Sequence, residues 1–350
     1  MIFSKKLISW YLENKRSMPW RETIDPYCIW LSEIILQQTR VAQGLPYYVS
    51  FTSQYPTVFD LANAEEEEVL KLWQGLGYYS RARNLHATAQ FIANDLNGVF
   101  PNNYKDLLKL KGVGDYTASA IASICYNEVV PVVDGNVYRV LSRYFNIDTP
   151  INSTQGVKEF KKIAFEFIDP EQPATYNQAI MEFGALQCKP QSPYCIVCPL
   201  SDSCESLKKG TVASLPVKLK KLKVKKRYFN YLIFYIRNQQ TIIRQRVGKG
   251  IWQNLYEFPL IESEDDVDLT YIEEHDDFKN LMDTKSYDIT LYENEFKIHK
   301  LSHQHLYTRF YVVKMDEIPE MSSALNLVEI EKIQEYPVPI LLGNFIDSFF

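Results

Sequence analysis

The stretch "LLKLKGVGDYTASAIASICY", residues 107–126, predicts two helices joined by a tight glycine turn. Gly112 and Gly114 permit the positive φ and the close backbone approach that such a turn requires. The second helix would begin with unpaired N–H groups, which form an anion site for a duplex phosphate without base readout. From the glycines alone, an ordinary tight helix–helix turn stays the alternative.

Helical periodicity surrounds this hairpin over most of residues 1–205. Apolar residues recur at helical spacing in 4–14, 27–44, 65–74, 80–96, 104–110, 115–126, 135–145, 154–168 and 173–187. Residues 206–227 are rich in lysine and predict a basic connector. From residue 228 aromatic and β-branched residues favour strands. We expect a mostly α region over 1–205 and an α+β domain over 228–350.

Length and charge bound the class of protein. The chain has 350 residues and 46% hydrophobic residues, as a globular two-domain protein does. The sequence contains no run of about eighteen apolar residues, so no membrane span is predicted. The first residues are typical of a helix rather than of a signal peptide. We therefore expect a cytoplasmic protein, nucleoid-associated if bacterial, with no membrane partner.

Charge differs between the two predicted parts. Residues 1–227 carry 27 Lys and Arg against 22 Asp and Glu, whereas residues 228–350 carry 11 against 21. Binding of a polyanion therefore belongs to the first part, if to either. Surface charge that serves solubility is the alternative explanation.

Four cysteines lie close together in "CKPQSPYCIVCPLSDSC", with the spacing C-x6-C-x2-C-x5-C. In a cytosolic protein such a cluster binds a metal more often than it forms disulfides. One compact loop suits an iron–sulfur cluster, while zinc sites usually pair two separated knuckles, so both stay open. The proposed ligands are Cys188, Cys195, Cys198 and Cys204.

Two carboxylates have unusual surroundings. Glu33 lies in the apolar stretch "PYCIWLSEIILQQTR" with no cationic neighbour on its helical face, so burial there would keep it protonated. Asp134 precedes a helix in "VVPVVDGNVYRVLSRYF", where a helix cap would keep it ionised. Glycoside cleavage needs such a pair of an acid and an anion. A solvated helix edge and a purely structural cap are the alternatives.

These motifs together resemble the endonuclease III-like helix–hairpin–helix DNA glycosylases. The hairpin L-x-G-V-G-x-x-T-A, the aspartate motif V-D-G-N-V-x-R-V and the cysteine spacing all match. The string W-L-S-E-I-I-L-Q-Q-T resembles the adenine DNA glycosylases of the MutY type. The resemblance implies a [4Fe–4S] cluster, a monovalent cation held by backbone carbonyls of the hairpin, and base flipping. It also implies that Glu33 protonates adenine N7 while Asp134 stabilises the sugar.

One position in the hairpin separates two mechanisms. In bifunctional members of the superfamily a nucleophilic lysine occupies the second residue after G-V-G, and here that residue is Tyr116. Tyrosine cannot form the Schiff base that β-elimination requires. The resemblance therefore implies a monofunctional glycosylase in which Tyr116 and Asn136 flank the sugar and orient Asp134.

The resemblance also implies side chains that read the duplex. They are Arg21 and Gln178 near the adenine pocket, Gln38 and Tyr78 beside the opposing base with Leu76 at the same tip, and Gly112 and Gly114 at a phosphate. Thr39, next to Gln38, is a polar residue of the type suited to filling the gap that an extruded base leaves. Core packing is the alternative for Tyr78. An extruded base must be replaced in the stack, which explains the aromatic and polar types.

The second part resembles the Nudix-like C-terminal domain of the same glycosylases through "GIWQNLYEFP", residues 250–259. The Glu-rich metal helix R-E-x-x-E-E is absent from the sequence, so we expect no phosphohydrolase activity. The resemblance assigns inspection of 8-oxoguanine to the loop "KLSHQHL" through Ser302 and His303. Leu301 replaces the family's aromatic residue, and a merely polar loop is the alternative.

Together, the residues and the resemblance imply a monomeric, monofunctional adenine DNA glycosylase of base excision repair. Its substrate would be double-stranded DNA with adenine opposite 8-oxoguanine and, more weakly, opposite guanine. Three rivals stay open: a thymine or uracil mismatch glycosylase, a noncatalytic iron–sulfur DNA sensor, and a zinc-binding structural protein.

Overall fold

The structure is a computed structural model that describes residues 2–219, 224–282 and 285–350. It forms two compact units, Met1–Asn63 with Asn84–Lys221 and Ala64–Arg83 with Leu222–Phe350. The sequence-based division placed residues 64–83 inside the first domain, whereas their contacts group them with the second unit. The Tyr79 hydroxyl, for example, donates to the Val338 carbonyl at 3.3 Å.

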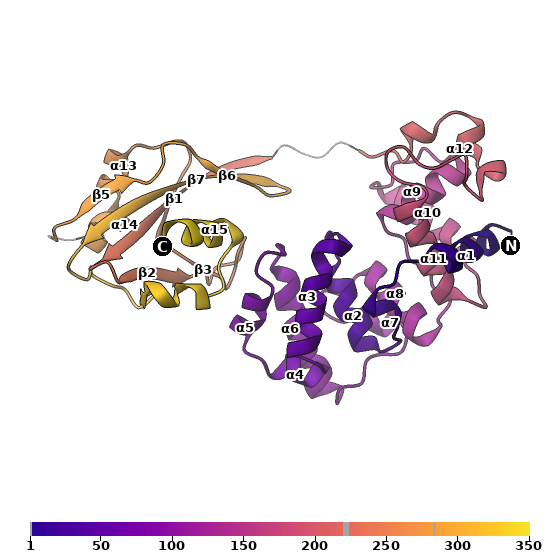
Figure 1. Ribbon diagram of the computed structural model, residues 1–350, viewed down its shortest axis with the longest axis horizontal. Coiled ribbons are helices and arrows are strands. Elements are labelled where there is room, and N and C mark those ends of the chain that lie inside the picture. The colour runs from indigo at the N-terminus through magenta and orange to yellow at the C-terminus, as the bar shows by residue number, and fades with distance from the viewer. Residues whose placement is uncertain (1, 220–223, 283–284) are drawn as a thin grey trace. The chain divides into compact units, whose positions relative to one another are not determined.

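The first unit is helical (Figure 1). Its α-helices are α1 (Ile2–Asn14), α2 (Pro26–Ile35), α3 (Val41–Gln54), α4 (Val58–Asn63), α7 (Tyr104–Leu107), α8 (Asp115–Tyr126), α9 (Gly135–Phe145), α10 (Thr154–Phe167), α11 (Pro173–Leu186) and α12 (Glu205–Lys208), with 3₁₀ turns η1 (Pro19–Arg21), η2 (Ser201–Ser203) and η3 (Val212–Ser214). Helix α6 (Ser80–Asp95) begins in the second unit and continues into the first. One apolar core joins α1, α9, α10 and α11.

Local signals in the sequence fix the ends of the helices that carry the site. Helix α2 begins with Asp25, which accepts a hydrogen bond from the Tyr27 amide, and has Pro26 at its first position. Helices α8 and α9 end at Asn127 and Asn146, both in the left-handed conformation that terminates a helix. The predicted spans 115–126 and 135–145 are confirmed.

The single helix predicted over residues 27–44 is wrong, because the chain breaks it into α2 and α3. Gln38 adopts φ 56° in the connection, which a continuing helix does not allow. A Cβ on Gly44 would lie 2.7 Å from the Leu36 side chain. Periodicity missed the break because both segments are apolar at helical spacing.

The second unit is built on an eight-stranded sheet with the order β3-β2-β1-β7-β5. Strands β4, β6 and β8 pair with β1, β7 and β2. The strands are β1 (Lys225–Ile236), β2 (Gln240–Gln245), β3 (Tyr256–Glu257), β4 (Leu260–Ser263), β5 (Asp288–Leu291), β6 (Lys297–Lys300), β7 (Gln304–Met315) and β8 (Leu325–Glu329). The two long strands β1 and β7 run parallel from Lys225 opposite Gln304 to Ile236 opposite Met315.

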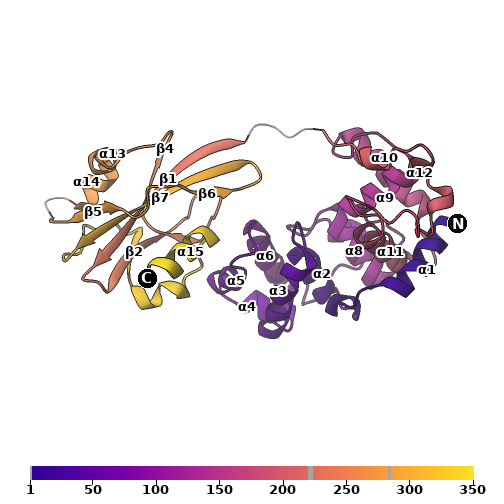
Figure 2. The same cartoon turned by 45° about the horizontal axis from the view of Figure 1, so that its top comes forward.

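Helices cover both faces of this sheet (Figure 2). They are α13 (Leu269–Glu274), α14 (Asp276–Met282) and α15 (Ile340–Phe349). The same unit also contains α5 (Glu66–Leu72) and η4 (Ile330–Glu335). Side chains Leu232 and Phe234 of β1 share a core with α13 and α14. On the opposite face, Phe310 of β7 stacks on Phe345 of α15 with ring centroids 4.0 Å apart. One sheet with helices packed on both faces is the α+β domain that the sequence predicts.

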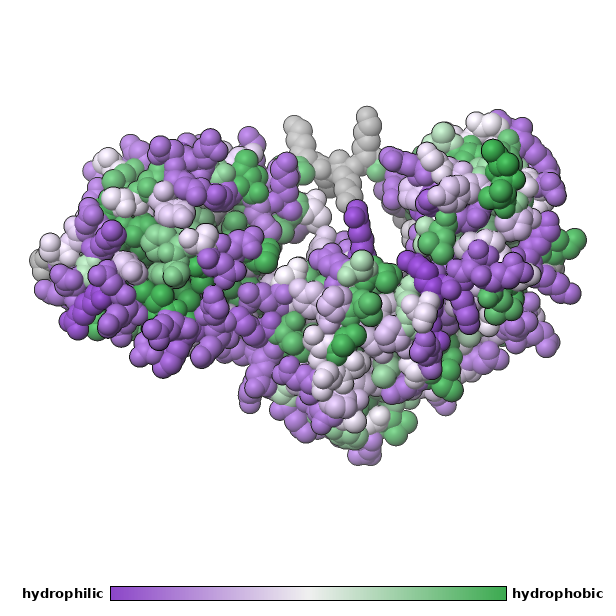
Figure 3. All heavy atoms as spheres, in the orientation of Figure 1, coloured by the Kyte–Doolittle hydropathy of each residue, from purple (hydrophilic) through white to green (hydrophobic). Residues whose placement is uncertain are grey.

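The visible surface is mostly hydrophilic, with apolar residues among the hydrophilic ones (Figure 3). Scattered apolar side chains are normal on protein surfaces. Within the described residues, no helix combines the length and the apolar character needed to cross a membrane.

Candidate active site

A cavity of about 190 Å³ in the first unit brings together side chains from α2, α8, α11 and the start of α9. The predicted residues that line it are Arg21, Glu33, Thr39, Tyr116, Asp134, Asn136 and Gln178. In the sequence they lie up to 157 residues apart, from Arg21 to Gln178. No lysine is among the described residues that line the cavity.

Glu33 is buried, with 9% of its surface exposed, so the solvated-edge alternative is wrong. Burial raises the pKa of Glu33 to about 7, while a hydrogen bond with Tyr116 and the charge of Arg21 act in the opposite direction. The nearby carboxylate of Asp134 raises the pKa further. Around neutral pH a large fraction of Glu33 therefore carries a proton that it can donate.

Asp134 caps α9, as predicted. Its Oδ1 accepts hydrogen bonds from the backbone amides of Asn136 at 2.9 Å and Val137 at 2.8 Å. Its Oδ2 accepts one from Asn136 Nδ2 at 2.7 Å. Burial nevertheless raises the pKa of Asp134, and these three hydrogen bonds oppose that shift. The sequence predicted the helix cap, but it did not reveal how deeply Asp134 is buried, and so the rise in its pKa was not expected.

Arg139 orients the amide that holds Asp134. Its Nη2 donates to Asn136 Oδ1 at 2.8 Å and to the Gly184 carbonyl at 2.7 Å, and its Nε donates to the Cys188 carbonyl at 2.8 Å. The Asn136 Nδ2 group is thereby turned toward Asp134. Sequence reasoning did not single out Arg139, although the matched aspartate motif contains it.

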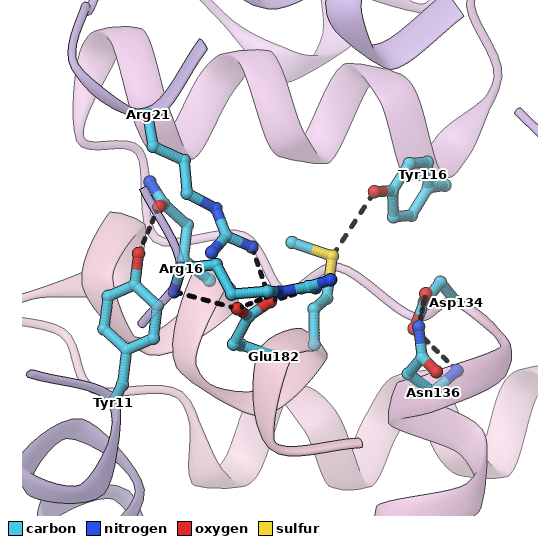
Figure 4. Close-up of polar contacts among 9 residues, drawn as sticks. Tyr11, Arg16, Arg21, Tyr116, Asp134, Asn136 and Glu182 are labelled. Carbon is cyan, nitrogen blue, oxygen red and sulfur yellow. Dashed lines mark hydrogen bonds and ion pairs between the residues drawn. The ribbon is translucent and has the colours of Figure 1, made fainter. Parts of the chain in front are cut away.

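Sequence reasoning also missed a buried ionic cluster beside Arg21. Glu182 of α11 is 1% exposed and accepts hydrogen bonds from both Arg16 and Arg21 (Figure 4). These two pairings hold the pKa of Glu182 at about 2, against the opposing effect of burial. All three residues line the Glu33 cavity. Their separation of more than 160 residues in sequence left no local pattern to detect.

The glycine hairpin has the predicted form. Gly112 adopts φ 79° in the turn between α7 and α8, and Gly114 is the N-cap of α8 without a side-chain cap. A Cβ at Gly112 would approach Asn84 Cβ to 2.8 Å. The first amides of α8 are therefore available to an anion.

The four clustered cysteines line a second cavity together with Arg143. Arg143 Nη1 donates to the Lys189 carbonyl at 2.7 Å and lies 3.5 Å from Cys188 Sγ. Within the described residues no three or more His, Cys, Asp or Glu side chains are arranged to hold a single metal ion. Four thiols spread around one cavity are a suitable donor set for an iron–sulfur cluster, because the cysteine ligands of a cluster are distributed over several irons rather than gathered on one ion.

A cavity of about 440 Å³ in the second unit joins two segments that were singled out separately. Leu76 and Tyr78 line it together with Leu301, Ser302 and His303. Tyr78 adopts φ 48° and is 48% exposed. Gln38 lines neither this cavity nor the Glu33 cavity and lies in the α2–α3 connection.

Comparison with known proteins identifies both units. Residues 31–165 match the HhH-GPD superfamily of base excision DNA repair proteins, and residues 231–348 match the NUDIX domain. The adenine DNA glycosylase of Buchnera aphidicola subsp. Baizongia pistaciae is 36% identical over 313 residues, which cover 88% of this chain and 84% of that protein. The adenine DNA glycosylase of Homo sapiens is 43% identical over 213 residues, 58% of this chain and 39% of that protein.

Solved structures agree with the helical fold. A thermostable thymine-DNA glycosylase is 30% identical with a TM-score of 0.55 and covers 59% of this chain and 96% of its own. An endonuclease III–DNA complex, 23% identical, matches with a TM-score of 0.51 over 59% of this chain and 94% of its own, and shows the fold alone. With the Nudix-like domain and the buried Glu33 in place, the chain belongs to the adenine DNA glycosylases, the DNA N-glycosylases of base excision repair.

Proposed function

We propose that this chain excises adenine opposite 8-oxoguanine and, more weakly, opposite guanine, and leaves an abasic site without cutting the strand. The observation that carries this proposal is the buried carboxyl of Glu33, whose pKa is raised to about 7. A carboxyl that still holds its proton near neutral pH suits protonation of a leaving base.

The two carboxyls divide the reaction. Glu33 gives its proton to N7 of the flipped adenine, and the C1′–N9 bond breaks with its electron pair passing to the base. Asp134, held by the amides of α9, stabilises the oxocarbenium-like sugar or transiently captures C1′. Water then adds at C1′, and the proton that it loses returns to a carboxylate.

Strand cleavage is not expected, because Tyr116 occupies the position at which a lysine would form a Schiff base. The Tyr116 hydroxyl interacts with Glu33 and lies 3.3 Å from Met181 Sδ. It therefore orients the acid rather than attacking the sugar. The described lining of the cavity offers no lysine in its place.

The cysteine cavity would hold a [4Fe–4S] cluster through Cys188, Cys195, Cys198 and Cys204. The cluster would organise the loop next to DNA phosphates. Arg143 supports the same loop, because its guanidinium donates hydrogen bonds to the carbonyls of Lys189 and Pro190. The Arg139 bond to the Cys188 carbonyl ties the same loop to Asn136.

Recognition of the opposing lesion is assigned to the cavity in the second unit. Ser302 and His303 can form hydrogen bonds with 8-oxoguanine or its phosphates, and Tyr78 can enter the base stack. Since one chain supplies both the excision cavity and this cavity, we expect a monomer to act on the chromosome.

A panel of duplexes tests this proposal under single-turnover conditions. Adenine opposite 8-oxoguanine should be excised fastest and adenine opposite guanine more slowly, while thymine or uracil opposite guanine should remain intact. The likeness to a thymine-DNA glycosylase makes the last two substrates informative. Faster excision of thymine or uracil than of adenine would replace the proposal with a mismatch glycosylase.

A further inference from the structure

Glu182 is the most heavily bonded carboxylate beside the Glu33 cavity. Arg16 donates to it through Nε at 2.7 Å, Nη2 at 2.7 Å and the backbone amide at 3.2 Å. Arg21 donates through Nη2 at 2.9 Å to the oxygen that Arg16 Nη2 also uses. Figure 4 shows the two guanidinium groups converging on this one carboxylate. Each oxygen is therefore committed to holding an arginine.

The cluster differs from a purely structural ion pair because its residues line the Glu33 cavity. Two arginines share one carboxylate, so the wall of the cavity carries excess positive charge. The Glu182 side chain is 1% exposed and that of Arg21 is 15% exposed. Arg21 Nη1 is buried without a hydrogen-bond partner in the described part of the chain. A buried unpaired donor is costly, and one that lines a ligand cavity can be satisfied by an atom of the ligand.

Tyr11 supports the same wall. Its hydroxyl donates to Gln178 Oε1 at 2.7 Å, and the Arg21 guanidinium lies 5.7 Å from the centre of its ring. With its amide oxygen taken by Tyr11, Gln178 can offer its NH2 group to a ligand. The wall thus offers hydrogen-bond donors, which match the ring-nitrogen acceptors of adenine rather than its exocyclic amine.

We propose that Glu182 is a positioning residue that holds Arg21 so that its free Nη1 donates to a ring nitrogen of the extruded adenine. Glu182 itself does not touch the base. The inference rests on the proposed function and adds to it the residue that fixes the base-binding arginine. Arg16 donates to both carboxylate oxygens and so fixes the orientation of the carboxylate that holds Arg21.

Chemical labelling tests the positioning without any turnover. Phenylglyoxal modification of Arg21, followed by mass spectrometry, should be slow in the wild-type protein and at least about tenfold faster in Glu182→Gln. The matched control is Glu257→Gln in the second unit, because Glu257 is also 1% exposed and also pairs with two arginines. That control should leave labelling of Arg21 unchanged. Equal protection of Arg21 in Glu182→Gln would overturn the proposal.

A double-mutant cycle tests whether Glu182 acts through Arg21. With enzyme in excess, Glu182→Gln should lower the single-turnover rate of adenine excision about tenfold or more, with duplex affinity changed by less than about twofold. In an Arg21→Ala background, the same substitution should cost less than about twofold. Losses that multiply would contradict the proposal.

The conservative variant and the two readouts keep the outcomes distinct. Glu182→Asp keeps the negative charge but places it one methylene further from Arg16 and Arg21. It should therefore lose less activity than Glu182→Gln. It takes the place of that variant if the amide prevents folding. Absence of excision by the wild-type protein would end the proposed function, whereas the labelling of Arg21 would still decide whether Glu182 positions it.

Discussion

At the scale of single residues, Glu33 combines a chemical role with a cost in stability. Its pKa is raised from 4.5 to about 7 because the carboxyl is buried. Arg21, Asp134 and Tyr116 face it and modulate this shift. Excision needs the protonated form, so the single-turnover rate should fall as the pH rises through about 7. A rate that rises through this range instead would exclude Glu33 as the acid.

The same shift predicts that Glu33→Gln stabilises the protein at high pH while abolishing excision. A raised carboxyl pKa gives stability that is complete below the unfolded value and is lost as the pH rises through the folded value. Removing the buried charge should therefore add up to about 3 kcal/mol at pH 8 and almost nothing at pH 4. Thermal unfolding at the two pH values measures the difference, and an equal effect at both would refute the assignment.

Asp134→Asn should separate binding from chemistry. Asparagine is also a good N-cap, so α9 should keep its start and the unfolding temperature should change little. The anion beside the sugar disappears, and we expect the excision rate to fall by at least about 100-fold. Duplex affinity, measured by fluorescence anisotropy, should be retained. Full turnover by this variant would remove Asp134 from the mechanism.

At the scale of elements, the hairpin between α7 and α8 depends on the backbone of Gly112. Gly112→Ala would impose a Cβ at φ 79° and bring it to 2.8 Å from Asn84 Cβ. We expect a loss of about 1–3 kcal/mol in unfolding free energy and weaker duplex binding. Gly210→Ala is the matched control, since Gly210 has φ 69° and open space around its Cβ position. If Gly112→Ala and Gly210→Ala weakened duplex binding equally, the hairpin would have no specific role in binding DNA.

Elements also show where sequence reasoning succeeds and where it stops. Capping and turn residues are local, so α8, α9 and the glycine turn could be predicted from Gly112, Asp134 and their neighbours. The break at Gln38 and the pairing of Glu182 with Arg16 depend on tertiary contacts that periodicity does not encode. Glu33 could be found because a carboxylate without a cationic neighbour in an apolar helix is unusual. The ion pairs of Glu182 with Arg16 and Arg21 in the same cavity could not.

At the scale of the whole molecule, the second unit should set lesion preference rather than the chemical step. Ser302→Ala combined with His303→Ala alters the cavity that Tyr78 also lines. We expect the preference for adenine opposite 8-oxoguanine over adenine opposite guanine to fall about tenfold or more, because two hydrogen bonds to the lesion are lost. Excision opposite guanine serves as the internal control and should change little. An unchanged preference would mean that this loop is only polar surface.

The most direct measurement uses a duplex labelled on the adenine strand, with one adenine opposite 8-oxoguanine and no added metal. After incubation, half of the sample is treated with alkali, which breaks the strand at abasic sites. The account predicts breakage only in the alkali-treated half, and none in either half with Glu33→Gln. Breakage without alkali, or excision that survives the loss of Glu33, would contradict it.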